Sequence, residues 1–112
     1  MRVSVIGAST PTDSGLDTAH KLGRVLARRG HIVVCGGLGG VMAAVCEGAR
    51  DADGHTIGIL PGEDRDAANE YIQTAIATGM GHARNALVVM NGDAAIAVEG
   101  SGGTLSEVGF AS

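Results

Sequence analysis

The chain is poor in aromatic residues and in cysteine. It has one tyrosine (Tyr71), one phenylalanine (Phe110) and no tryptophan, so valine, isoleucine, leucine and alanine must fill the core. Its two cysteines, Cys35 and Cys46, are too few for a disulfide framework, and both lie in apolar stretches. We therefore expect two buried free thiols in a cytoplasmic protein.

Long hydrophobic runs are also missing. The longest uncharged stretch, residues 30–46, contains five glycines, so it does not have the composition of a membrane-spanning helix. The first residues have the pattern of a strand and not of a signal peptide. The sequence therefore predicts no membrane partner.

Positive charge is scarce. Eight lysine and arginine residues against twelve aspartate and glutamate residues give a net charge of -4, and the basic cluster at residues 24–29 is typical of a helix C-terminus. Proteins that bind duplex nucleic acid usually carry a basic face, so no nucleic-acid partner is expected. The four histidines are scattered without a zinc-ligand spacing, so no metal site is predicted.

Glycine is the residue in excess. It occupies 19 of 112 positions, without the three-residue period of collagen. Hydrophobic residues make up 45% of the chain, which excludes disorder by composition. The length suits one domain, residues 1–112.

Short apolar runs alternate with helical patterns along the chain. Strands are expected at residues 3–6, 31–35, 56–60, 71–78 and 94–98, and helices from 12 or 13 to 30, at 41–49, at 81–90 and from 104 to the C-terminus. A helix remains an alternative at 71–78. The alternation predicts an α/β fold with right-handed crossovers and a parallel sheet. Because the last helix would have only about eight residues, the fold is expected to be cut short at its C-terminal end.

Glycine-rich turns follow several of the predicted strands. The candidate ligand-binding residues are Gly7 and Ser9 in the first turn, Gly36, Gly37, Gly39, Gly40 and Met42 in the second, and Gly100, Ser101, Gly102, Gly103 and Thr104 in the last. In an open parallel sheet such turns share the carboxyl edge, where free helix N–H groups suit a phosphate. They match neither a Walker loop nor a dinucleotide fingerprint. We predict a phosphate-binding edge; tight turns without any ligand are the alternative.

Two charged residues accompany these turns. Arg84 lies early in a predicted helix near the same edge, where a cation opposes the helix dipole. This indicates an anionic partner; a solvated side chain is an equal alternative. Asn85 beside it is a further candidate contact. Glu107 lies three residues after Thr104, and a helix capping box would explain this pair without any function.

Four segments, taken together, resemble the LOG-like family, whose members are often misnamed lysine decarboxylases. They are GGLGGVM at residues 36–42, GILP at 58–61, TGMGHARN at 78–85 and GTLSE at 103–107. Within the family, the branch with the molybdenum cofactor carrier proteins is most similar. The resemblance covers nearly the whole chain. It implies a Rossmann-like parallel sheet with helices on both faces, and a homodimer or larger homo-oligomer.

The resemblance implies two activities. Cytokinin-activating members are phosphoribohydrolases that cleave the N-glycosidic bond of a nucleoside 5′-monophosphate, and their arginine and glutamate correspond to Arg84 and Glu107. Two departures from the family signature, Glu99 for a proline and Ser101 for a glycine, count against hydrolysis. We therefore expect a carrier of a phosphorylated nucleotide- or pterin-like ligand, such as the molybdenum cofactor or a nucleoside monophosphate, with no cofactor required. A phosphoribohydrolase and a nucleotide-sensing regulatory module are the alternatives.

Overall fold

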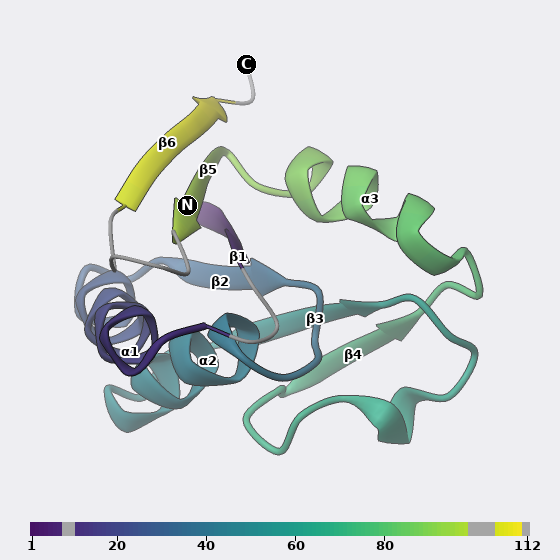
Figure 1. Ribbon diagram of the computed structural model, residues 1–112, viewed down its shortest axis with the longest axis horizontal. Coiled ribbons are helices and arrows are strands. Elements are labelled where there is room, and N and C mark those ends of the chain that lie inside the picture. Colours follow the sequence, from purple (N-terminus) through teal and green to yellow (C-terminus); the bar gives the residue numbers. More distant parts are fainter. Residues whose placement is uncertain (8–10, 99–104, 111–112) are drawn as a thin grey trace.

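A computed structural model describes residues 1–7, 11–98 and 105–110 of the chain (Figure 1). Its centre is a six-stranded sheet in the order β4-β3-β2-β1-β5-β6. The strands are β1 Arg2–Gly7, β2 Ile32–Cys35, β3 Thr56–Leu60, β4 Thr74–Ala77, β5 Ala94–Val98 and β6 Leu105–Phe110. The α-helices are α1 Asp13–Arg28, α2 Val41–Asp51 and α3 Arg84–Met90, and the short 3-10 helices are η1 Arg65–Ala67 and η2 Gly81–Ala83.

Helices cover both faces of the sheet. On one face α1 and α2 lie together and bury side chains such as Val5 and Val33. On the other face α3 packs through Val88 on Val34 and Ile59. Strands β1 to β5 are parallel, and their apolar composition fits strands buried on both sides. The predicted Rossmann-like α/β fold is confirmed. None of the helices in the described residues is long and apolar enough to cross a membrane.

Helix α1 begins and ends as its sequence predicts. The Thr12 side chain caps the helix, since its Oγ1 accepts a hydrogen bond from the Gly15 N–H at 3.2 Å. At the other end Gly30 adopts a φ of 78°, the left-handed conformation that ends a helix at little cost. These two residues therefore set the length of the helix.

The cap at Thr12 leads to a stability prediction. We expect Thr12→Ala to lower the free energy of unfolding by about 1 kcal/mol, because the Gly15 N–H loses its acceptor. Thr12→Ser keeps a hydroxyl at the same place and serves as the matched control. Urea unfolding followed by circular dichroism measures both variants. Equal midpoints for alanine and serine would contradict the capping role.

Two glycines bring α1 and α2 into close contact. A Cβ atom added at Gly23 would lie 2.0 Å from the Val45 carbonyl oxygen, and one at Gly48 would lie 1.9 Å from the His20 carbonyl oxygen. Both neighbours are backbone atoms, which cannot rotate away. The two helices therefore approach each other at a distance that a side chain at either position would prevent.

The predicted fourth strand is shorter in the structure. The sequence predicts it at residues 71–78, and the structure has it at Thr74–Ala77. Just before it, the Thr56 hydroxyl donates to the Tyr71 carbonyl at 2.5 Å and accepts from the Gln73 N–H at 2.9 Å. The Tyr71 carbonyl is therefore bonded to a side chain and not to a neighbouring strand, while the Gln73 N–H also donates to the Thr56 carbonyl at 3.2 Å. The next predicted helix, 81–90, is divided into η2 and α3.

The predicted last helix is wrong. Residues Leu105–Phe110 form strand β6, which pairs antiparallel with β5. A helix of about eight residues is marginal without a surface to pack on, whereas pairing with β5 satisfies backbone groups of both strands. The capping box proposed for Thr104 and Glu107 needs a helix there, so it is wrong as well. Glu107 instead lies in a strand, at the register position of Ile96.

Candidate functional site

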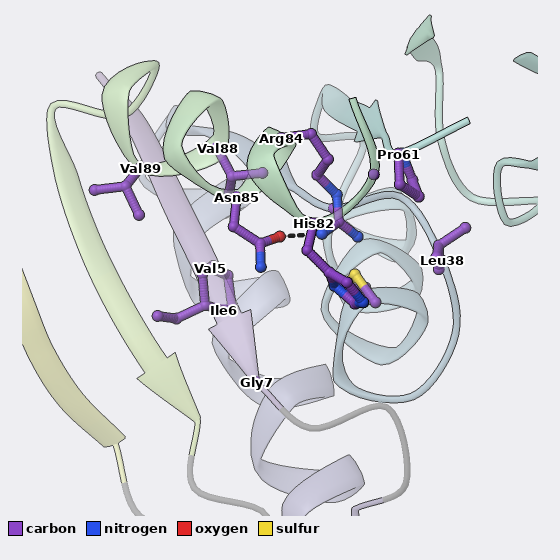
Figure 2. Close-up of a pocket in the computed structure, with 13 residues that line it drawn as sticks. Val5, Ile6, Gly7, Leu38, Pro61, His82, Arg84, Asn85, Val88 and Val89 are labelled. Atoms are coloured by element: carbon purple, nitrogen blue, oxygen red, sulfur yellow. Dashed lines mark hydrogen bonds between the residues drawn. The ribbon is translucent and has the colours of Figure 1, made fainter. Parts of the chain in front are cut away.

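A pocket of about 550 Å³ lies at the carboxyl end of the central strand β1 (Figure 2). Chain segments from both sides of the sheet line it: the end of β1, the turn after β2, Pro61 after β3, and the η2–α3 segment. Strand β1 is the point at which the sheet order reverses, because β2 follows on one side and β5 on the other. Ligands of open α/β sheets bind at this position.

The two sides of the pocket differ in polarity. Ile6 of β1 and Val88 and Val89 of α3 supply aliphatic side chains, whereas the start of α3 supplies polar groups. Pockets for small ligands commonly combine apolar walls with a few polar groups that fix orientation. The arrangement suits a molecule with an apolar ring at one end and a charged group at the other.

Arg84 is the charged group of the pocket. Only 7% of the residue is exposed, although its side chain carries a full charge. Its Nε donates to the Ile59 carbonyl at 3.0 Å, and its Nη1 donates to Asn85 Oδ1. Among the described residues, no carboxylate lies within 4.0 Å of the guanidinium. A nearly buried charge without a counterion is unfavourable, so this position favours an anionic ligand.

The glycine at position 36 makes room for that guanidinium. A Cβ atom added there would lie 2.7 Å from Arg84 Nη2 and 2.7 Å from the Met42 sulfur. The first glycine-rich turn therefore brings its backbone against Arg84, which is the close approach that glycine permits. Gly36 and Arg84, 48 positions apart in the sequence, form one wall of the pocket.

The structure brings five predicted site residues together. Gly7, Gly36, Met42, Arg84 and Asn85 all line the pocket.

Three other glycines of the second turn, Gly37, Gly39 and Gly40, are outside the lining. Gly37 packs against Leu60 and Gly58, and Gly40 precedes α2. Ser9 and the last turn, Gly100 to Thr104, lie outside the described residues, as does the side chain of Glu107. The binding roles predicted for these residues stay predictions.

Asn69 holds the second glycine turn in place, a role that the sequence did not reveal. Its Nδ2 donates to the Leu38 carbonyl at 2.8 Å, and its backbone N–H donates to the Gly37 carbonyl at 2.8 Å. Its Oδ1 accepts from the Tyr71 N–H at 2.9 Å. About thirty positions separate Asn69 from the turn, so no local pattern could indicate the contact. His82 was also not among the predicted site residues, and it lies in the pocket lining.

Two thiols lie beneath the same turn. Cys35 and Cys46 are free and buried, as predicted, and their sulfur atoms are 3.5 Å apart. The Cys46 thiol, the Gly37 backbone and the charge of Arg84 all lower the pKa of Cys35, against the effect of burial. The hydrogen bond to Cys35 and burial raise the pKa of Cys46. Cys35 is therefore the thiol of the pair that loses its proton first.

Comparison with known proteins places this geometry in a family. The molybdenum cofactor binding protein of Rippkaea orientalis is 36% identical, with a TM-score of 0.85 over 88% of this chain and 61% of that one. The molybdenum cofactor carrier protein of Chlamydomonas reinhardtii is 31% identical, with a TM-score of 0.79 over 87% and 61%. A probable cytokinin riboside 5′-monophosphate phosphoribohydrolase of Oryza sativa is 36% identical over 82% of this chain.

This chain spans only part of each similar protein's length. The chain spans 42% of the rice protein and 61% of the Rippkaea chain. A model of the SLOG cluster4 family, in contrast, matches all of residues 1–112. The resemblance to LOG-like proteins is thereby confirmed, and the chain belongs to the SLOG cluster4 family.

Proposed function

We propose that this chain binds and carries a small phosphorylated ligand of nucleotide or pterin type, with the molybdenum cofactor as one candidate cargo. The observation that carries the proposal is Arg84, a nearly buried cation with no carboxylate partner among the described residues, at the edge of a largely aliphatic pocket. A phosphate would supply the missing charge, and a planar ring would cover the aliphatic wall.

Each part of the pocket has a role in this proposal. Arg84 pairs with the phosphate through its guanidinium, which the bond to the Ile59 carbonyl holds in place. The missing side chain at Gly36 leaves room for the Arg84 guanidinium, and that at Gly7 leaves room for Val41 of α2. The glycine turns at residues 36–40 and 100–104, together with Ser9, offer N–H groups to the phosphate. A carrier needs no reacting group, and its ligand is cargo rather than a resident cofactor.

Solved structures that are similar to this chain support this proposal. Two of them bind or carry the molybdenum cofactor according to their names, and their likeness covers 88% and 87% of this chain. We further propose that the protein acts in the cytoplasm as a homo-oligomer.

Phosphoribohydrolysis is the second candidate, favoured by the 36% identity to the rice enzyme. In that case Glu107 would stabilise the positive charge that develops on the ribose, or orient the attacking water, while Arg84 holds the phosphate. A nucleotide-sensing module would also use the pocket, but its oligomeric state or its partner would change when the ligand binds.

One experiment separates the carrier from the enzyme. The full chain is incubated with a panel of nucleoside 5′-monophosphates, and chromatography measures free base and ribose 5-phosphate. The variant Glu107→Gln runs alongside, with the exposed Glu70→Gln as matched control. A carrier binds ligand and releases no base. Release that Glu107→Gln abolishes and Glu70→Gln retains would establish the hydrolase instead.

A further inference from the structure

A second cluster of side chains lies between α1 and α2, away from the lining of the pocket. His20 of α1 faces Glu47 and Asp51 of α2. Its Nε2 is 2.9 Å from Asp51 Oδ2 and 3.6 Å from Glu47 Oε1, and one ligand atom from each residue lies within 4.8 Å of the other two. The two carboxylates are four positions apart on one helix, which puts them on the same face.

These distances approach the dimensions of a metal coordination sphere. Zinc binds imidazole nitrogen and carboxylate oxygen at about 2.0–2.2 Å, so two ligand atoms at a tetrahedral angle are about 3.3 Å apart. The two measured distances from His20 Nε2, 2.9 and 3.6 Å, lie on either side of this value. Small side-chain rotations would let all three atoms contact one ion.

The charge around the cluster favours a cation. Within the part of the chain that the structure describes, no lysine or arginine comes within 4.0 Å of Glu47 or Asp51, and His20 is their ion-pair partner. Lys21 is engaged by Asp17 instead, at 3.0 Å. The cluster therefore holds two negative charges against one imidazole.

The surroundings of the cluster leave an open position for a further ligand. The neighbouring Glu47 and Glu70 carboxylates raise the pKa of Tyr71. Next to the cluster is a hollow of about 540 Å³, lined in part by His20, Glu47 and Tyr71. It leaves room for a water molecule as fourth ligand.

We propose that His20, Glu47 and Asp51 bind a divalent transition metal ion, with Zn²⁺ as the preferred ion. One nitrogen and two oxygen ligands suit zinc better than Mg²⁺, which prefers oxygen ligands alone and keeps most of its water. The ion joins α1 to α2, and His20 binds it through Nε2 with its remaining proton on Nδ1. Histidine spacing in the sequence does not reveal this site, because its ligands come from two helices.

Calorimetric titration of the full chain with ZnCl₂ tests the proposal. We expect one Zn²⁺ ion to bind per chain. In His20→Gln and in Asp51→Asn we expect the affinity for Zn²⁺ to fall about tenfold or more. The matched control is His55→Gln, which removes an exposed histidine bound to Thr74 Oγ1 and is expected to bind as the parent does. Circular dichroism without metal shows that each variant is folded; Asp51, with 55% of its side chain exposed, tolerates replacement.

A Co²⁺ spectrum identifies the ligand atoms. We expect no thiolate-to-cobalt charge-transfer band, because Cys35 and Cys46 are buried elsewhere. A thiolate band would overturn the proposal. So would an absence of Zn²⁺ binding, an unchanged affinity in His20→Gln, or an equal loss in His55→Gln.

Discussion

Replacing Arg84 by methionine is expected to weaken binding of a phosphorylated ligand by about 2–3 kcal/mol, or roughly 30- to 150-fold. The reason is the loss of charge-assisted hydrogen bonds in a site where only 7% of the residue is exposed to water. Arg84→Lys keeps the charge but not the planar fork, so an intermediate affinity is expected. Calorimetric titration with a nucleoside 5′-monophosphate measures all three proteins.

The ligand-free protein should respond differently. Arg84→Met removes a nearly buried charge as well as the bond to the Ile59 carbonyl, and these two effects oppose each other. We therefore expect little change in the free energy of unfolding without ligand. Arg50→Met is the matched control, because Arg50 also donates to a backbone carbonyl, that of Gly54 at 3.0 Å, and lies outside the pocket. Equal affinities for the Arg84 and Arg50 variants would refute the role of Arg84.

The largest expected effect on stability belongs to Gly48→Ala. The new Cβ would meet the His20 carbonyl oxygen at 1.9 Å and the Arg24 backbone nitrogen at 3.1 Å, so α1 and α2 must move apart. Overpacking of this kind costs about 3 kcal/mol or more, well above the gain of about 1 kcal/mol that alanine brings to a helix. Urea unfolding measures the loss.

A control and a double variant sharpen this test. At Gly62 a Cβ atom would meet nothing within 4 Å, so Gly62→Ala should leave stability nearly unchanged. Once Gly48→Ala has separated the helices, Gly23→Ala should cost less than it does alone, because both act on one contact. Strictly additive losses would mean that the two glycines pack independently.

Local signals predicted most of the fold. The strand 56–60 and the strand 94–98 have the bounds that their β-branched and apolar runs indicate, and Thr12 and Gly30 mark the ends of α1 as their chemistry requires. These features depend on neighbouring residues alone. The segment 105–110 was predicted wrongly because a short apolar stretch fits a helix or a strand, and the available pairing edge of β5 decided between them.

The candidate site, like the fold, has parts that local sequence signals predict and parts that they do not. The glycine turn and Arg84 were recognisable as residue types, and the sheet edge that joins Gly7, Gly36 and Arg84 followed from the parallel order. The burial of Arg84 and the anchoring of the turn by Asn69 were not predictable, since both depend on contacts between distant segments. The His20 cluster was not predictable either, because its residues come from two helices and no spacing in the sequence indicates a contact between helices.

The position of β1 in the sheet has a consequence for how the chain folds. Strand β1 is synthesised shortly before β2, with which it pairs on one side. Its other neighbour is β5, so Val3 cannot pair with Ala94 until that later strand has been made. During synthesis β1, β2 and β3 can assemble with α1 and α2, while one edge of the central strand stays open. Such distant pairings slow folding and expose an edge to other chains. The pocket, which needs both the end of β1 and the start of α3, therefore cannot form until α3 has been synthesised.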